Sequence, residues 1–272
     1  MKTCLSIAGS DSSGGAGIQA DLKTFTALGV YGMTAITAIT AQNTQGVHAV
    51  TTVKPNLVAA QIDAVFNDIR PDAVKIGMLA NANIIEVVAD RLRFHEAKNV
   101  VLDPVMIATS GDSLLDQHAT RTLVDKLIPC ADLITPNTAE LIALCQEQGI
   151  TVTSQSLSKE TLKALTQQLL SSLFNNTPQS SIAILSKGGH LIGEQASDYL
   201  LTSQTDFWFE SPRVETVNTH GTGCTLSSAI TSYLALDHCL DDSCSKAKQY
   251  LTAALNKNLN LGKGNGPLNH II

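Results

Sequence analysis

Short apolar runs that fit β-strands alternate along the chain with segments whose apolar residues recur at helical spacing. This alternation is typical of an α/β fold, in which helices connect neighbouring parallel strands. The pattern predicts strands at residues 3–8, 32–41, 73–76, 99–102, 132–134 and 181–186, with an antiparallel pair near 196–210. It predicts helices at residues 18–28, 55–68, 82–95, 116–128, 138–147 and 158–173, another from residue 222, and a last one over 243–259.

The chain shows no low-complexity linker and no internal repeat. Its polar stretches at 151–158 and 174–180 are predicted to be surface loops and not domain boundaries. A sheet covered by helices often reaches this length as one unit. We therefore expect a single domain over residues 1–272.

Composition refines the expected architecture. Hydrophobic residues make up 44% of the chain, while 15% are charged and 4% are aromatic. The core must therefore be built mainly from Ala, Ile, Leu and Val, which suits a parallel sheet buried on both faces. The formal net charge is −6 and no basic run is present, which argues against nucleic acid or an anionic membrane as a partner.

Other features of the composition indicate a compartment. No apolar run approaches the length of a membrane span, and the first ten residues are too short and too polar for a signal peptide. The six cysteines form no Cys-x-x-Cys pair, so a disulfide framework or a zinc site is not expected. We expect the protein to work in the reducing cytoplasm.

The first glycine-rich turn spans residues 9–17, between a predicted strand and a predicted helix. Residues 15–20 match the pattern G-x-G-x-x-A, which by itself suggests a dinucleotide fold and a nicotinamide-dependent oxidoreductase. However, residues 32–45 contain no Asp or Glu to bind a ribose hydroxyl, and no Walker lysine follows the turn. The glycines also fit a second interpretation, in which the backbone closes over a small flat ligand.

The second glycine-rich turn lies within residues 219–228, after a predicted β-like run at 213–217 and at the start of a long helix. Free N–H groups at a helix start attract anions through hydrogen bonds and the helix dipole. Cys224 lies in the first turn, where the same field is expected to stabilise a thiolate. From the motif alone, an anion site and a tight turn with a structural cysteine remain equally good interpretations.

Motifs that recur in order over nearly the whole chain decide between these interpretations. They are Gly9-Ser10-Asp11, Gly14 through Thr24, Thr40 through Thr44, Lys75 through Leu79, Asp103 through Met106, Thr135 through Glu140, Lys187 through His190, Asn218 through Ser228 and the tail Gly262-x-Gly264-x-Gly266-Pro267-x-Asn269-His270. Together they resemble the bacterial hydroxymethylpyrimidine/phosphomethylpyrimidine kinases. The resemblance implies a ribokinase-like three-layer αβα sandwich with a mostly parallel central sheet.

The resemblance also implies an activity. Members of this family are expected to use ATP and Mg²⁺ to phosphorylate 4-amino-5-hydroxymethyl-2-methylpyrimidine, and then its monophosphate, in thiamine biosynthesis, often as homodimers. It assigns the catalytic base to Cys224, whose thiol pKa the helix start would have to lower. It places an anion hole at Gly221, Thr222 and Gly223 for the transferring phosphoryl oxygens.

The remaining expected site residues are also carried over from the resemblance. Asp103 is expected beside Mg²⁺ and the phosphates, Asn137 and Glu140 near the metal, and Lys187 on the ATP phosphates. The alternative for Asp103 is an Asp-Pro turn, and for Glu140 an ordinary favourable charge near a helix start. Asp21 is interpreted as a structural salt-bridge or helix residue.

Four residues are expected to contact the pyrimidine. Gln42 offers both a donor and an acceptor to an aminopyrimidine edge, although a capped strand end would also explain it. Ala16 and Met78 are expected to line the pocket, and Gly9 opens the turn that would close over the ring. Three histidines, His190, His220 and His270, could face the site, but a lone histidine is more often structural.

Two departures from the family pattern and four rival functions remain. Ser12 stands where the family usually has Pro, and Glu215 where relatives often have Asp, so Glu215 is left out of the expected site. The rivals are a pyridoxine or pyridoxal kinase, the nicotinamide-dependent oxidoreductase, a non-catalytic ligand sensor and a cysteine acyl transferase. A sensor should lack the set formed by Asp103, Glu140, Lys187 and Cys224, and the acyl transferase lacks an assignable His/Asp pair.

Overall fold

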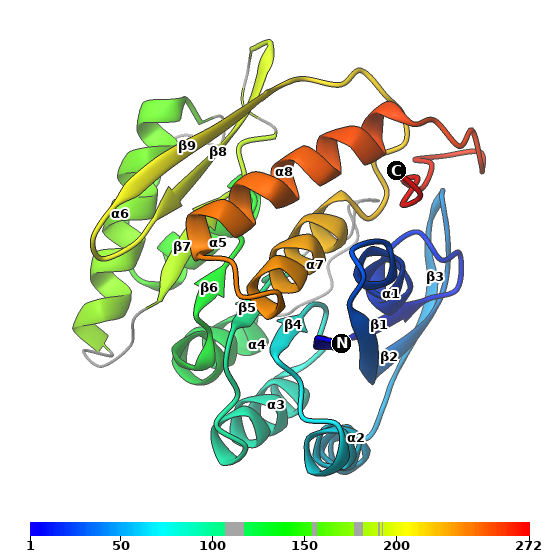
Figure 1. Ribbon diagram of the computed structural model, residues 1–272. Helices are drawn as coiled ribbons and strands as arrows, with labels where there is room; N and C mark the ends of the chain where they lie inside the picture. Colours follow the sequence, from blue (N-terminus) through cyan, green and yellow to red (C-terminus); the bar gives the residue numbers. More distant parts are fainter. Residues whose placement is uncertain (107–116, 154–156, 177–181, 190, 192) are drawn as a thin grey trace.

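The computed structural model describes residues 1–106, 117–153, 157–176, 182–189, 191 and 193–272. Within them, a central sheet has the strand order β3-β2-β1-β4-β5-β6-β7-β8-β9 (Figure 1). All neighbours from β2 to β7 pair in parallel, while β3, β8 and β9 pair antiparallel at the two edges. The strands are β1 (Thr3–Asp11), β2 (Tyr31–Asn43), β3 (Gly46–Thr52), β4 (Ala73–Ile76), β5 (Val100–Leu102), β6 (Leu133–Ile134), β7 (Ala183–Ser186), β8 (Gln195–Leu201) and β9 (Asp206–Pro212).

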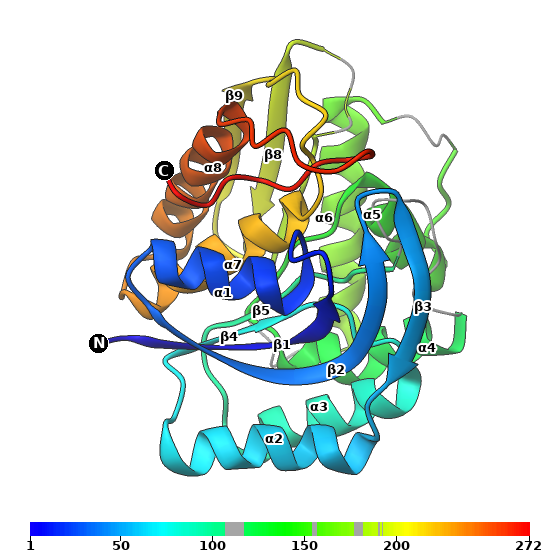
Figure 2. The same cartoon turned by 90° about the vertical axis from the view of Figure 1, so that its right-hand side faces the viewer.

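Helices cover both faces of the sheet and complete three layers. Helices α1, α7 and α8 pack on one face, and α2 to α6 cover the other (Figure 2). The helices are α1 (Gly17–Ala27), α2 (Pro55–Asp68), α3 (Ala82–Phe94), α4 (Gln117–Thr122), α5 (Thr138–Glu147), α6 (Lys159–Asn176), α7 (Thr222–Ala235) and α8 (Leu240–Asn256), with a π-helical turn η1 (Leu123–Leu127) and a 3-10 turn η2 (Ile128–Cys130) after α4. This is the predicted three-layer sandwich.

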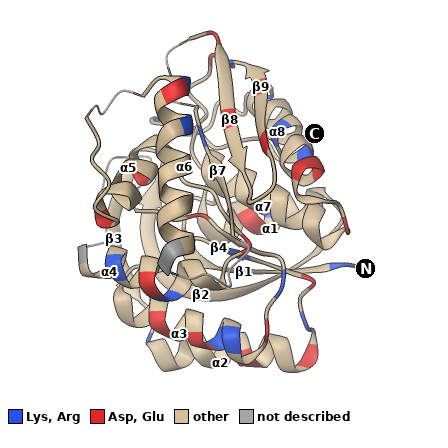
Figure 3. Cartoon of the chain, turned by 90° about the vertical axis from the view of Figure 1, so that its left-hand side faces the viewer, with Lys and Arg blue, Asp and Glu red and all other residues tan. Residues whose placement is uncertain are grey.

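The core follows from strands that are apolar on both faces. Successive residues of a strand point to opposite sides of the sheet, so Val100 and Leu102 of β5 pack towards helices α2 to α6, while Val101 packs towards α7 and α8. Most charged side chains lie on the outer helices and loops, whereas Lys75 of β4 and Asp198 of β8 are buried. Figure 3 views the side of the molecule that lies on the left in Figure 1. Positively and negatively charged residues are scattered over the described residues on this side.

The predicted elements are found with small shifts in their ends, but two predictions need correction. Strand β3 was not predicted, because this edge strand is mostly exposed and lacks an alternating apolar pattern. The β-like run predicted at 213–217 is wrong: β9 ends at Pro212, the following residues are irregular, and the side chain of Val217 is 70% exposed.

The helix predicted at 116–128 is α4 followed by the π and 3-10 turns, and the helix predicted at 243–259 begins earlier, at Leu240. Residues 116 and 181, and much of the two predicted surface loops, lie outside the described residues. None of the described helices combines the length and the apolar character needed to span a lipid bilayer.

Candidate active site

A cavity of about 630 Å³ lies at the carboxyl ends of the parallel strands. Parallel strands end at the same edge of a sheet, so β4, β5, β6 and β7 place the residues that follow them side by side. The cavity wall contains every predicted site residue, namely Gly9, Ala16, Gln42, Met78, Asp103, Asn137, Glu140, Lys187, Gly221, Thr222, Gly223 and Cys224. The fold therefore gathers the set that the motifs singled out.

The start of α7 forms one wall of the cavity. Gly221 caps the helix at φ +85°, a conformation that favours glycine, and a Cβ there would lie 1.9 Å from the carbonyl oxygen of Gly15. The N–H of Thr222 already donates to the carbonyl of Thr219 at 3.2 Å. In the described chain, the amides of Gly223 and Cys224 have no such acceptor. The N–H of Gly221 likewise has no acceptor among the described residues, so the amides open to an anion are those of Gly221, Gly223 and Cys224, which include two of the three expected residues.

Cys224 lies half-buried in this first turn. Burial raises the pKa of its thiol to about 11, while Lys75 acts in the opposite direction. Asp21 and Asp103 add to the effect of burial, and a hydrogen bond from the backbone of Gly17 opposes it. Burial and the two carboxylates thus raise the pKa of this thiol more than Lys75 and the Gly17 amide lower it, so a lowered net pKa is not found in this structure.

Beside Gly223, a lysine lies between two carboxylates. The Nζ of Lys187 lies 2.6 Å from Asp103 Oδ1 and 3.9 Å from Glu140 Oε2, and Thr135 donates its hydroxyl to Asp103 at 3.0 Å. Burial works against ionisation of Asp103, but Lys187, Lys75 and Thr135 outweigh it, so the pKa of Asp103 lies below its usual value. Asp103 is therefore part of a charged cluster and more than an Asp-Pro turn.

The pKa of Glu140 is shifted in the opposite direction to that of Asp103. Burial raises the pKa of Glu140 to about 7, although Lys187 lowers it. Its Oε2 accepts the backbone N–H of Asn137 at 2.7 Å, and the side chain of Asn137 accepts the N–H of Glu140 at 2.9 Å. The pair forms a capping box at the start of α5, so the side-chain oxygen of Asn137 is already engaged.

The oxygen ligands at this end suit Mg²⁺ better than a transition metal. The described residues contain no group of three His, Cys, Asp or Glu side chains placed to hold a metal together. Mg²⁺ needs no such cage, because it retains several waters and is usually held by one or two carboxylates and substrate phosphates. Asp103 and Glu140, both buried and flanking Lys187, fit that requirement.

Gln42 lies at the other end of the cavity, near the end of β2. Its side-chain oxygen accepts the hydroxyl of Thr40 at 3.2 Å. The hydroxyl of Ser12 donates to the carbonyl of Gln42 at 2.8 Å and accepts its N–H at 2.9 Å. The serine that replaces the family's proline therefore fixes the backbone of Gln42. In the same cavity wall, Gly9 leaves room for Met78, whose sulfur would lie 3.3 Å from a Cβ at position 9.

Comparisons with known proteins agree with this geometry. The family described as phosphomethylpyrimidine kinase matches residues 11–269. The chain is 47% identical to the hydroxymethylpyrimidine/phosphomethylpyrimidine kinase of Salmonella typhimurium over 98% of this chain and 96% of that protein. The chain belongs to the phosphomethylpyrimidine kinase family.

Two further relatives of this family member differ in architecture or activity. The thiamine biosynthesis bifunctional protein ThiED of Geobacter sulfurreducens is 44% identical over 98% of this chain, which corresponds to 52% of that protein. The ADP complex of Bacillus subtilis pyridoxal kinase superimposes with a TM-score of 0.85 at 35% identity, covering 99% of this chain and 97% of the other. The fold is therefore the one that this kinase uses.

Sequence reasoning did not place Lys75 in the site of this phosphomethylpyrimidine kinase family member. Lys75 lines the cavity, and its Nζ contacts both carboxylate oxygens of the fully buried Asp21 at 2.9 Å. Ser6 and Ser228 also donate to Asp21, at 2.6 and 2.7 Å. Asp21 is thus the structural salt-bridge residue that was expected. A lysine inside an apolar strand must pair with a buried acid. The position of Lys75 within the apolar run 73–76 could therefore have identified it as a buried, paired residue.

Two of the three histidines have structural partners. His220 Nε2 lies 2.8 Å from Asp11, whose carboxylate also accepts the amides of Ser13, Gly15 and Ala16. Burial opposes ionisation of Asp11, but these hydrogen bonds hold its pKa at about 2. His220 therefore joins the two glycine-rich turns.

His270 lies 3.0 Å from the hydroxyl of Thr225, and burial lowers its pKa to about 4. It is therefore neutral at pH 7 and belongs to the core beneath α7. His190 lies outside the described residues, and Glu215 is not part of the cavity wall.

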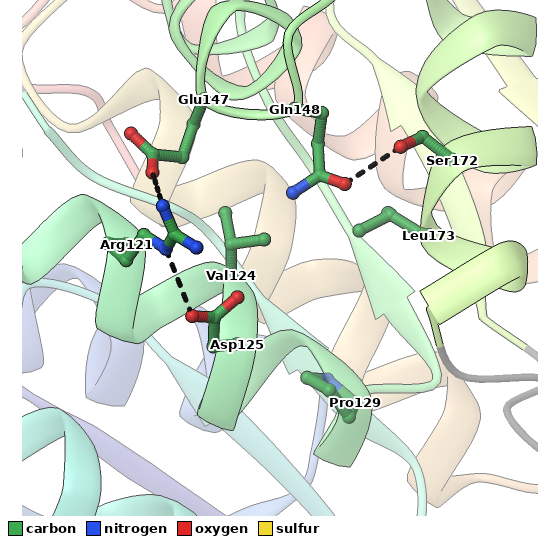
Figure 4. Close-up of a pocket in the computed structure, with 8 residues that line it drawn as sticks. All are labelled: Arg121, Val124, Asp125, Pro129, Glu147, Gln148, Ser172 and Leu173. Atoms are coloured by element: carbon green, nitrogen blue, oxygen red, sulfur yellow. Dashed lines mark hydrogen bonds and ion pairs between the residues drawn. The ribbon is translucent and has the colours of Figure 1, made fainter.

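A second cavity, of about 580 Å³, lies between the α4–η1 segment and helices α5 and α6 (Figure 4). None of the predicted site residues lines it. Its charged groups pair with one another, since Arg121 contacts Asp125 at 3.2 Å and Glu147 at 3.7 Å. The chemistry expected of this kinase family is concentrated in the first cavity.

Proposed function

We propose that this protein transfers the γ-phosphate of ATP to 4-amino-5-hydroxymethyl-2-methylpyrimidine, and then to its monophosphate, in thiamine biosynthesis. One observation carries the proposal: a single cavity joins Gln42, the amides at the start of α7 and the Lys187 cluster. Membership of the phosphomethylpyrimidine kinase family supports the reaction, and the name of the ThiED relative supports the pathway.

Each end of the cavity has a distinct task in this proposal. The side-chain amide of Gln42 recognises the aminopyrimidine edge. Gly9, Ala16 and Met78 form the walls around the ring. Lys187 orients the ATP phosphates, and the amides of Gly223 and Cys224 stabilise the transferring oxygens. Mg²⁺, held by Asp103 and Glu140 largely through its waters, supplies positive charge to the phosphate oxygens when bound.

The chemical step needs an acceptor for one proton. The substrate oxygen forms a bond to the γ-phosphorus while the bond to the bridging oxygen of ADP breaks, and the hydroxyl proton passes to Cys224 Sγ. The thiolate must first form, and a thiol with a pKa of about 11 is mostly protonated at pH 7. The single-turnover rate is therefore expected to rise about tenfold per pH unit between pH 7 and 9. A flat profile would contradict cysteine as the base.

A direct assay tests the function. Purified protein is incubated with Mg-ATP and the hydroxymethylpyrimidine, and the mono- and diphosphate are separated and quantified. Cys224→Ala should abolish most turnover and leave pyrimidine binding largely intact, while Cys239→Ala, at an exposed cysteine, should behave like the wild type. Wild-type turnover in Cys224→Ala would rule out the thiol as base.

The pyridoxal kinase likeness supports a second candidate function, phosphorylation of pyridoxine or pyridoxal. The same assay with these alcohols separates the two. Turnover of pyridoxine without turnover of the pyrimidine would overturn our proposal. The dinucleotide interpretation has lost its basis, because a Cβ at Gly15 would lie 2.3 Å from His220 and one at Gly17 would lie 2.3 Å from the Gly9 carbonyl. Gly15 thus packs the first turn against the second, and Gly17 lets the first turn close on itself.

The assembly and compartment belong to the same proposal. We propose a homodimer through the strand pair β2 and β3, on which the side chains of Tyr31, Ile39 and Val50 are 50%, 58% and 43% exposed. Light scattering should give twice the monomer mass for the wild type, and Ile39→Lys should reduce it; a monomeric wild type would reject the dimer. One domain over 1–272 and a reducing cytoplasm complete the proposal, the latter because all six cysteines are free.

A further inference from the structure

The segment after α8 contains a glycine-rich motif to which the proposed function gives no task. Gly262, Gly264 and Gly266 precede Pro267, and this stretch, residues 261–267, is named the tail strap here. In Figure 2 it runs from the end of α8 across to the tip of the β2–β3 hairpin. It does not line the cavity, but it contacts two segments that do.

At one end the tail strap rests on Thr44, two residues beyond Gln42. The hydroxyl oxygen of Thr44 accepts the backbone N–H of Lys263 at 3.1 Å and that of Gly264 at 3.2 Å. A Cβ at Gly262, whose φ is +89°, would lie 2.4 Å from this hydroxyl oxygen. A Cβ at Gly264 would lie 2.1 Å from the Thr44 carbonyl oxygen. The strap can approach Thr44 only because both residues are glycine.

At the other end the tail strap is bound to the turn before α7. Gly266 donates its N–H to the carbonyl of Val217 at 3.1 Å and accepts the N–H of His220 at 3.0 Å. A Cβ at Gly266 would lie 1.9 Å from Asn218 Oδ1. His220 immediately precedes Gly221, the residue that caps α7. The strap therefore ends next to the amides that face the phosphoryl group.

We propose that the tail strap ties the hairpin carrying Gln42 to the turn carrying the amides of Gly223 and Cys224, and that Thr44 is a positioning residue for phosphoryl transfer. The proposal rests on the proposed function, because it concerns how the pyrimidine and phosphate ends of that site are kept in register. Effective transfer needs both ends placed within a fraction of an ångström. Thr44 acts through the strap and does not touch the reacting atoms.

The test compares two replacements of one side chain. Thr44→Val removes the hydroxyl and keeps the branched shape, whereas Thr44→Ser keeps the hydroxyl. Thr51→Val, at an exposed threonine of the same hairpin, is the matched control. The KM values for the pyrimidine and for ATP, kcat, and amide hydrogen exchange of residues 262–266 and 218–224 are measured for each.

Thr44→Val should speed amide exchange in both segments, lower kcat about fivefold and raise the pyrimidine KM about fivefold, since it removes two hydrogen bonds worth about fivefold each. The KM for ATP should change less, and Thr44→Ser and Thr51→Val should match the wild type. Unchanged exchange in Thr44→Val, faster exchange with wild-type kinetics, or failure of Thr44→Ser to restore either would overturn the proposal. Exchange does not depend on turnover, so a wild type without pyrimidine kinase activity would refute the proposed function, while unchanged exchange would still refute the strap.

Discussion

The buried pair of Lys75 and Asp21 gives the sharpest prediction about stability. Both side chains are fully buried and meet at 2.9 Å, so neither charge has water to stabilise it. Removing one partner of such a pair typically costs about 3–5 kcal/mol, because the other charge stays buried without compensation. Lys75→Met should therefore lower the free energy of unfolding by this amount, which corresponds to a fall in Tm of about 6–20 °C.

The assay is urea unfolding at pH 7.5, followed by fluorescence of the single tryptophan, Trp208. Asp21→Asn should cost about as much as Lys75→Met, and the double variant should recover about 2–3 kcal/mol relative to their sum. Lys246→Met removes a half-exposed lysine that contacts Asp242 at 3.2 Å, and it should stay within about 0.5 kcal/mol of the wild type. A loss below about 1 kcal/mol in Lys75→Met, or additive singles, would refute the reasoning.

Three shorter predictions follow from other contacts. Because His270 has a folded pKa of about 4 against about 6.5 unfolded, the stability it contributes above pH 6.5 is lost as pH falls, by about 3 kcal/mol at pH 4; urea unfolding of His270→Asn should lack this part of the acid slope. Ser12→Ala should raise the pyrimidine KM about fivefold, because both hydrogen bonds to the Gln42 backbone are lost. Gly221→Ala should lower kcat more than about tenfold, because its Cβ meets the Gly15 carbonyl.

Clear outcomes would contradict each of these. A parallel acid slope in wild type and His270→Asn would show that other groups cause it. An unchanged pyrimidine KM in Ser12→Ala would show that the strand alone holds Gln42. A fully active and stable Gly221→Ala would show that the turns can separate without harm.

The sequence predicted the layers because the strands are apolar on both faces and the helices are amphipathic. It also predicted the two turns, because glycine at positions such as 17 and 221 marks backbone that other residues rarely adopt. Edge strand β3 was missed, since an exposed strand needs no apolar pattern. Its pairing with the preceding strand β2 leaves most of its side chains exposed, so no apolar pattern marks the strand.

The chemical state of the site was even less accessible to sequence reasoning. The helix start at Cys224 is a local feature and could be predicted, but the burial and the carboxylates that raise the thiol pKa come from other elements. The partner of Lys75 lies 54 positions away, on α1. A motif thus indicates which groups meet, and only the folded structure shows which charges dominate.

The contact between the two glycine-rich turns also determines how this enzyme could be recombined with a relative. The turn at 9–17 and the turn before α7 fit each other through Gly15, Gly221 and the Asp11–His220 contact, although some 200 positions separate them. In a chimaera, the first 45 and the last 57 residues should therefore come from one parent, so that the interlocking surfaces remain matched. The intervening 170 residues can then be exchanged as one segment, provided that the other parent supplies the same cavity residues there, among them Asp103, Glu140 and Lys187, and the buried lysine that pairs with Asp21.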